Sequence, residues 1–182
     1  PARVAAPAEG EPAYLVKRDG EPIGSLVMKT TRDGPRTTVV SDYGIQIRLM
    51  SIVLYRYDKR MVETYEDGRL VAVVHPNGSL TAPLGTLGTT YWPRATVQQT
   101  QMIDSSDGIL VDVAVAGPVA AEIRVDGRTL KADRYAMTGD LERELWYAAD
   151  GGEWLGMRMK ASDGSTIEIL RDWPPLWKRG LL

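Results

Sequence analysis

Eight dipeptides of Asp or Asn followed by Gly divide the sequence at spacings that suit short β-hairpins. Asp-Gly and Asn-Gly tolerate the positive φ angles that tight hairpin turns need at their two central residues. A short apolar run flanks each pair, which is typical of strands on either side of a turn. The sequence therefore predicts a meander of antiparallel strands with turns at 19–20, 33–34, 67–68, 77–78, 107–108, 126–127, 150–151 and 163–164.

Between these turns, apolar and polar residues alternate with the period of two that a strand with one buried face shows. In the stretch 155–160, Leu155, Met157 and Met159 share one face, and Arg158 and Lys160 share the other. One face of each such strand should therefore meet the core and the other should meet solvent. The same alternation occupies 109–115, 119–125, 141–147 and 167–169.

Two segments depart from this pattern. The stretch from Gln46 to Tyr57 is apolar on both faces in its middle. It predicts a central strand covered on both sides or, alternatively, a short buried helix. The stretch from Arg94 to Ile103 is the best candidate for a helix, because the preceding Pro93 suits the start of one.

The chain of 182 residues is long enough for one domain with one sizeable core. The predicted fold class is all-β, a single antiparallel meander of about ten to twelve strands that forms a strongly curved sheet, half-barrel or barrel. Residues 1–12 are expected to be a disordered leader, and residues 13–171 the antiparallel β domain. Residues 172–182, with Trp173, Leu176 and Trp177 around two prolines, are expected to be a tail that packs on the sheet or on a partner.

Composition excludes several classes of function. The net charge is only -2, so the chain has no basic field for nucleic acid. The absence of cysteine rules out disulfides, thiolate metal sites and thiol nucleophiles. The longest apolar runs fall far short of the roughly 20 residues that a membrane-spanning helix needs, so no membrane span is expected. No cofactor or metal is predicted, because the sequence contains no phosphate loop, dinucleotide fingerprint or EF-hand loop.

Few residues offer catalytic chemistry. His75 is the only histidine, and it ends a strand that enters the turn at 77–78. Without a nucleophile motif, a turn histidine is favoured over an acid-base catalyst. Asp140, Glu142 and Glu144 share one strand face, where a carboxylate pair could serve a glycosidase or a hard cation. A solvated face is the simpler interpretation, because apolar side chains occupy the opposite face.

The connection from Thr81 to Pro93 is uncharged and carries Tyr91 and Trp92 side by side. Loops are usually short and polar, so a long aromatic connection in the middle of the chain needs a structural reason. We expect it to cross an open side of the curved sheet, where Tyr91 and Trp92 plug the opening. A mobile lid that gates a ligand is the alternative.

Five short segments also resemble, in the same order, those of a known bacterial family. They are YLVKRDGEPIG at 14–24, VLYRYD at 53–58, TYWP at 90–93, GDLERELWY at 139–147 and WLGM at 154–157. The family is the one filed as domain of unknown function 6134. The resemblance implies an exported, periplasmic protein of Gram-negative bacteria, with a curved sheet similar to periplasmic lipoprotein-carrier half-barrels. It implies no catalytic residues.

An apolar excess without catalytic motifs favours a periplasmic binding or carrier protein that holds a hydrophobic, lipid-like ligand in the concave face of the sheet. The alternative is a β-barrel enzyme of the cyclase or isomerase type that acts on a hydrophobic small molecule, with a tyrosine, His75 or a carboxylate as acid-base group. A third hypothesis makes the C-terminal tail a docking peptide for another protein. The predicted ligand-binding residues are Tyr55, Tyr57, Tyr91, Trp92, Trp146, Met157 and Met159.

Overall fold

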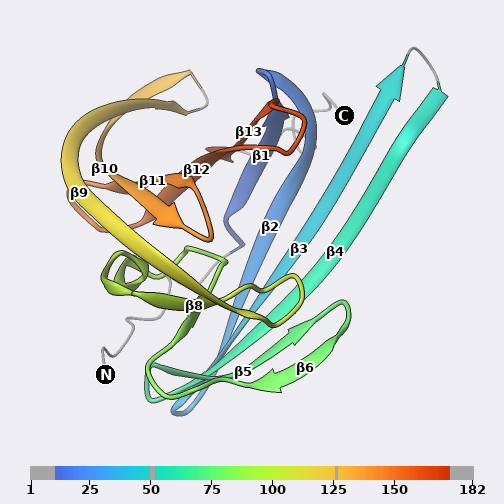
Figure 1. The fold of residues 1–182 in the computed structure, drawn as a ribbon. Coiled ribbons are helices and arrows are strands. Elements are labelled where there is room, and N and C mark those ends of the chain that lie inside the picture. The colour runs from blue at the N-terminus through green and yellow to red at the C-terminus, as the bar shows by residue number, and fades with distance from the viewer. Residues whose placement is uncertain (1–10, 50–51, 126, 173–182) are drawn as a thin grey trace.

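The computed structural model describes residues 11–49, 52–125 and 127–172, and nearly all of its regular structure is strand (Figure 1). The predicted leader at 1–12 and the predicted tail at 172–182 lie almost entirely outside the described residues, so both remain predictions. Within the described part of the chain, no helix is long and apolar enough to cross a membrane.

The described residues form thirteen strands and one short 3-10 helix, η1 (Arg94–Gln98). The strands before η1 are β1 (Ala13–Arg18), β2 (Glu21–Asp33), β3 (Arg36–Leu49), β4 (Ile52–Glu66), β5 (Arg69–His75), β6 (Gly78–Thr81) and β7 (Leu87–Gly88). The strands after it are β8 (Gln101–Ile103), β9 (Leu110–Val125), β10 (Arg128–Gly139), β11 (Arg143–Ala148), β12 (Trp154–Lys160) and β13 (Thr166–Asp172).

These strands join into one sheet with the order β6-β5-β4-β3-β2-β1-β13-β12-β11-β10-β9-β8-β7. Most chain neighbours pair as antiparallel hairpins, and β13 returns to pair with β1. β7 and β8 are the exception, since they pair in parallel. Among the described residues no pairing joins β6 to β7, so the sheet is curved and open. The predicted all-β curved antiparallel sheet is confirmed, with slightly more strands than expected.

The Asp-Gly and Asn-Gly pairs lie at the connections between strands, as predicted. Asp19 and Gly20 have φ angles of 48° and 88°, and Asp67 and Gly68 have φ angles of 49° and 75°. Two successive positive φ angles are those of a type I′ hairpin turn. Residue 126 lies outside the described residues, and the other seven pairs all join consecutive strands.

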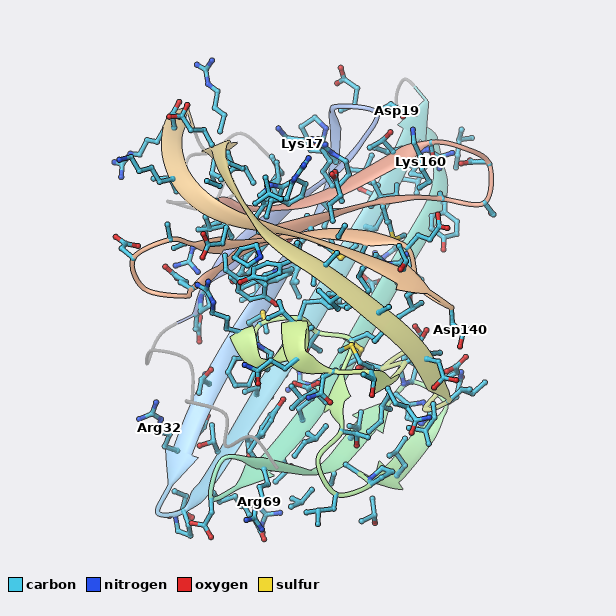
Figure 2. The ribbon with its side chains drawn as sticks, turned by 60° about the vertical axis from the view of Figure 1, so that its left-hand side comes forward. Lys17, Asp19, Arg32, Arg69, Asp140 and Lys160 are labelled. Carbon is cyan, nitrogen blue, oxygen red and sulfur yellow. The ribbon has the colours of Figure 1, made fainter. Side chains whose placement is uncertain are left out.

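The main core lies inside the curve of the sheet. Figure 2 shows η1 and β8 on this inner side, in the space between β2–β4 and β9. Side chains from both halves of the sheet meet there, and Trp154, Tyr147 and Leu26 are among the largest that are fully buried. Burying one large apolar side chain contributes about 1.5–3 kcal/mol, so this core holds the two halves together.

A smaller apolar cluster lies on the opposite face of β11 and β12. It exists because β9 bends between Ala116 and Val119, where the pairing with β10 shifts register. Such a bulge bends and twists a strand. Before the bend Val113 packs in the main core, and beyond it β9 turns to the outer face. The cluster consists of Ile123, Val125, Ala132, Trp146 and Leu155, with Leu130, Ala148 and Leu170 packed against it.

The stretch from Gln46 to Tyr57 is not one covered strand, so that prediction is wrong. It spans the end of β3 and the start of β4, which pair with each other up to Leu49 and Ile52. Tyr55 there is 51% exposed, because the ribbon extends past the elements that cover the main core. The apolar residues on both faces therefore mark an exposed ribbon.

Two smaller predictions are also wrong. The segment from Arg94 to Ile103 is η1 followed by β8, and η1 starts without a side-chain cap or an acidic residue in its first turn. Leu155 lies on the opposite face from Met157, because β12 carries an extra residue between the partners of Trp146 and Tyr147. A bulge shifts the alternation of faces by one residue.

Candidate functional site

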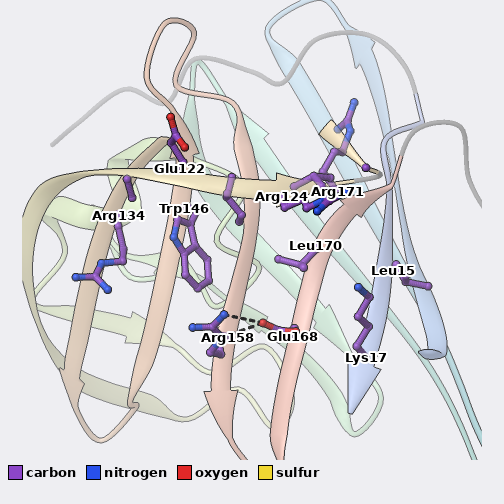
Figure 3. A pocket seen from close by; sticks show the side chains of 14 residues that line it. Leu15, Lys17, Glu122, Arg124, Arg134, Trp146, Arg158, Glu168, Leu170 and Arg171 are labelled. Atoms are coloured by element: carbon purple, nitrogen blue, oxygen red, sulfur yellow. Dashed lines mark hydrogen bonds and ion pairs between the residues drawn. The ribbon is translucent and has the colours of Figure 1, made fainter. Parts of the chain in front are cut away.

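An open trough of about 590 Å³ lies where the second half of β9, after the bend at Ala116 to Val119, crosses β11, β12, β13 and β1 (Figure 3). The outer faces of these four strands form its floor, and β9 forms a wall across them. The bend in β9 therefore creates the trough, because a straight strand would have continued past the edge of this face.

The register of the sheet sorts the floor into two neighbouring rows of side chains. Residues that stand directly opposite each other on antiparallel strands lie side by side on one face. The apolar row consists of Leu15 on β1, Leu170 on β13, Gly156 on β12 and Trp146 on β11. The charged row, two residues away, consists of Lys17, Glu168, Arg158 and Glu144 on the same four strands.

Arg158 connects the two rows. Its Nε and Nη2 donate to Oε1 of Glu168 at 2.9 and 2.8 Å, and its Nη1 donates to Oε2 of Glu144 at 3.1 Å. Its guanidinium carbon lies 5.2 Å from the centre of the Trp146 ring, within the range of a cation-π contact. Partial burial lowers the pKa of Arg158, but its hydrogen bonds to Glu168 and Glu144 outweigh this and raise it. The guanidinium therefore stays charged beside the indole.

The trough carries more positive than negative side chains. Its basic residues are Lys17, Arg124, Arg134, Arg158 and Arg171, and its acidic residues are Glu122, Glu168 and, in the charged row, Glu144. The three arginines from β10, β12 and β13 form ion pairs with Glu144, Glu168 or Glu153. Among the described residues, Lys17 and Arg124 have no carboxylate within ion-pair distance, so they remain available to an anion.

A family model described as Domain of unknown function (DUF6134) matches residues 14–75 and 71–172. The chain belongs to this family. The resemblance found in the sequence is thereby confirmed, and the match extends from β1 to β13, including both rows of the trough.

No curated protein matches the chain. A solved structure titled "Crystal structure of MucB" is similar with 15% identity and a TM-score of 0.37, over 88% of this chain and 50% of that one. The chain thus spans half the length of that structure.

In this DUF6134 chain, the seven predicted ligand-binding residues do not gather at one place. Trp146 lines the trough. Met157 and Met159 lie on the main-core face of β12. Tyr55 and Tyr57 stack on the exposed part of β4, with ring centres 6.4 Å apart. Tyr91 and Trp92 are buried in the main core.

The connection that carries Tyr91 and Trp92 is held by a buried carboxylate. Glu63 on β4 is 1% exposed and accepts hydrogen bonds from Tyr65 Oη at 2.9 Å, Thr90 Oγ1 at 2.9 Å and Trp92 Nε1 at 3.0 Å. Gly88 packs against the same group, since a Cβ atom there would lie 2.2 Å from Oε1 of Glu63. We call Glu63, Tyr65, Thr90 and Trp92 the Glu63 latch.

A second contact fixes the backbone beside the latch. The hydroxyl of Tyr147 donates to the carbonyl oxygen of Tyr91 at 2.6 Å. Tyr91 has a φ angle of 61°, which a non-glycine residue adopts rarely and which surrounding contacts must hold. Burial raises the pKa of the Tyr91 phenol to about 12, so it is neutral at physiological pH. The contact with Tyr147 therefore helps to hold the connection in place at Tyr91.

The latch predicts a specific pH dependence. Burial raises the pKa of Glu63 above its ordinary value of 4.5, although hydrogen bonds from Trp92, Thr90 and Tyr65 oppose the shift. A carboxyl group with a higher pKa in the folded state stabilises the fold fully below 4.5, and this contribution is lost as pH rises through the folded pKa. Glu63→Gln cannot ionise, so its free energy of unfolding relative to that of the wild type should increase as pH rises above 4.5.

Urea unfolding at a series of pH values measures this difference. Glu66→Gln is the matched control, because Glu66 is exposed on the same strand. The difference from the wild type should change more with pH for Glu63→Gln than for Glu66→Gln. An equal change in the two variants would contradict the raised pKa.

The other candidate catalytic groups lie apart from the trough, except for Glu144 in the charged row. Asp140 accepts a hydrogen bond from the backbone N–H of Asp112 at 2.8 Å, and Glu142 is exposed. His75 ends β5, where it pairs with Gly78 of β6. Within the described ranges, no group of three or more His, Cys, Asp or Glu side chains could hold a metal ion. The enzyme hypothesis stays a prediction.

Proposed function

We propose that the protein binds an amphipathic molecule, with an acyl chain and an anionic head group, in the trough. The observation that supports this most strongly is the adjacent pair of rows on the floor, one apolar and one charged. Such a surface suits a ligand whose apolar and charged parts are joined. The volume of about 590 Å³ lies within the range of about 300–1,000 Å³ that is usual for small-molecule sites.

The acyl chain would lie along the apolar row. Leu15 and Leu170 form the half-buried floor there, and Trp146, Ile123 and Val125 lie buried in the cluster beside them. Burial of one methylene group contributes about 0.8 kcal/mol, so a chain of about ten carbons offsets the loss of translational freedom on binding.

The positive charges of Lys17 and Arg124 would attract the head group. These side chains have no described carboxylate partner, whereas Arg158 already donates to two glutamates. A hydrogen bond between an anion and such a cation contributes about 1.5–3 kcal/mol. Lys17 and Arg124 therefore provide specificity for an anionic lipid over a neutral one.

A carrier role in the periplasm is part of the same proposal. It is supported by the family resemblance of the sequence and by the open form of the trough, which lets a ligand enter and leave without a lid. The natural ligand would then be a fatty acid or a phospholipid, whose shared chemistry is an acyl chain next to an anion.

Dansyl-labelled undecanoic acid tests the proposal directly. We expect its emission to rise and shift to the blue on binding, because the dansyl group enters an apolar site. Dodecanoate should displace it better than dodecanol or dodecylammonium, since only dodecanoate offers an anion to Lys17 and Arg124. Native mass spectrometry of the same mixtures should show one ligand per chain. Failure of the wild type to bind dodecanoate and the labelled acid would overturn the proposal.

Charge-reversal variants separate the head-group contact from the apolar contact. Lys17→Glu and Arg124→Glu should each weaken dodecanoate binding by about tenfold, or ~1.4 kcal/mol, and leave dodecanol binding unchanged. Arg128→Glu is the matched control, because it makes the same charge change at an exposed position on β10 that does not line the trough. Equal weakening in all three variants would contradict a local head-group site.

A further inference from the structure

The first half of β4 is a free edge of the sheet. β4 begins at Ile52, but β5 pairs with it only from Val62 to Glu66. Among the described residues, the stretch from 53 to 61 has a partner on one side only, which is β3. Figure 1 shows this end of the β3–β4 ribbon projecting beyond the rest of the sheet. A row of backbone N–H and C=O groups therefore faces outward along it.

The same stretch carries exposed apolar side chains. Val53 is 45% exposed, Leu54 61%, Tyr55 51% and Tyr57 36%. Natural edge strands are usually protected by charges, prolines or bulges, because a long apolar edge pairs with other strands. Two charges within and beside this patch, on Arg56 and Asp58, form an ion pair with each other at 2.7 Å. They therefore protect the edge only weakly.

We infer that this edge pairs with the same edge of a second copy of the chain, antiparallel and about a twofold axis at Tyr55. A contact between two identical edges closes after two copies, so it gives a defined dimer. The two sheets would continue into each other across β4. This inference does not depend on the trough, which is built from other strands.

The side chains favour a twofold axis at Tyr55 over an axis at a neighbouring residue of β4. There Tyr55 faces Tyr55 of the second copy, and Val53 faces Tyr57, so apolar side chains on one face meet each other. An axis at Arg56 would place the two Arg56 side chains opposite each other, and like charges in that position are destabilising. An axis nearer to the hairpin tip would leave Tyr57 outside the apolar contact.

Steric limits exclude an axis farther along β4. With the axis at Tyr57, residue 52 of the second copy would stand opposite Val62. That position is already occupied by Val74 of β5. The end of β5 therefore limits how far the second copy can slide, and the axis at Tyr55 lies within this limit.

Single cysteine variants test the register. The chain has no native cysteine, so a disulfide in such a variant joins two chains. Residues directly opposite each other have Cα atoms about 4.5–5.5 Å apart, which suits a disulfide. With copper phenanthroline as oxidant, Tyr55→Cys should form a two-chain species rapidly. Tyr57→Cys should not, because the two copies of residue 57 would lie about 13 Å apart along the strand.

A mixture of Val53→Cys and Tyr57→Cys should form the mixed disulfide, because these positions face each other across the axis. Faster cross-linking of Tyr57→Cys alone than of Tyr55→Cys would overturn the register. The cysteine variants need no change in the core, since both tyrosines are exposed.

Analytical ultracentrifugation of the wild type gives an independent measurement. We expect a two-copy species that dissociates on dilution. Tyr55→Glu should weaken it by about tenfold, because two carboxylates would face each other at the axis. Leu84→Glu, the same kind of change at a side chain that is 77% exposed outside this edge, should have no effect. A single-chain species at all protein concentrations would overturn the inference.

Discussion

Replacing Glu63 with alanine should lower the free energy of unfolding by about 3–5 kcal/mol, because it removes the acceptor of a buried network. Tyr65, Thr90 and Trp92 all donate to this carboxylate. In the variant, three buried donors would face a cavity in place of an acceptor, and each unpaired donor costs about 1–3 kcal/mol. The midpoint of thermal unfolding should fall by roughly 10 °C or more.

Glu66→Ala is the matched control for this prediction. Glu66 lies on the same strand but is exposed, so its removal should change the free energy of unfolding by less than about 0.5 kcal/mol. Urea unfolding followed by circular dichroism measures both variants. The indole N–H resonance of Trp92 reports whether its hydrogen bond is lost. A destabilisation of Glu63→Ala below about 1 kcal/mol would contradict the role assigned to the latch.

The latch also bears on whether the connection from 81 to 93 is a plug or a lid. To open, the connection would have to break the contacts of Thr90 and Trp92 with Glu63 and expose two large aromatic side chains. Segments that open readily have few buried contacts. The connection has many, so a fixed plug accounts for the structure better than a lid does.

Features with local causes could be predicted from the sequence. The Asp-Gly turns follow from backbone preferences of two residues, and the structure places them between strands. The alternation in 141–147 depends only on the pleat of one strand, and Leu145 and Tyr147 are indeed in the main core. The thirteen strands roughly match the predicted ten to twelve, and β7, with only Leu87 and Gly88, is too short to show an alternating pattern.

The pattern from Gln46 to Tyr57 predicts the wrong environment for the exposed ribbon, for a physical reason. An edge that meets another chain and a strand buried inside its own chain both carry apolar residues on both faces. The sequence from Gln46 to Tyr57 therefore fits either case. An exposed edge and a buried strand differ in whether another strand covers the segment. Here β5 ends before it reaches the segment, so no strand of the described chain covers it on that side.

The trough could not be predicted, because it depends on the register of several strands and on the bend in β9. The alternation places Glu144, Arg158 and Glu168 on solvent faces, but it does not show that they stand next to one another. That neighbourhood follows from the pairing of β11, β12 and β13. The bulge at Leu155 has one signal in the sequence, the adjacent Gly156 inside an alternating run.

Gly156→Ala should lower the free energy of unfolding by about 2–4 kcal/mol and should also deform the trough. Gly156 has a φ angle of 151°, and a Cβ atom there would lie 2.2 Å from the carbonyl oxygen of Ile169 and 3.0 Å from the Cα atom of Leu170. Both of these atoms belong to the backbone of β13, so the strand itself must move away. Leu170 and Glu168, which lie on the same face of β13, would then leave the two rows that form the floor.

Gly164→Ala separates this clash from backbone strain. Gly164 has a positive φ angle of 83° in the turn between β12 and β13, but a Cβ atom there would meet nothing within 4 Å. Its cost should be about 1 kcal/mol, the strain of the backbone alone. Urea unfolding gives both losses, and binding of dansyl-labelled undecanoic acid, measured where both variants are folded, should weaken only for Gly156→Ala. Equal losses of stability with unchanged binding would show that backbone conformation, and not the contact with β13, requires glycine at position 156.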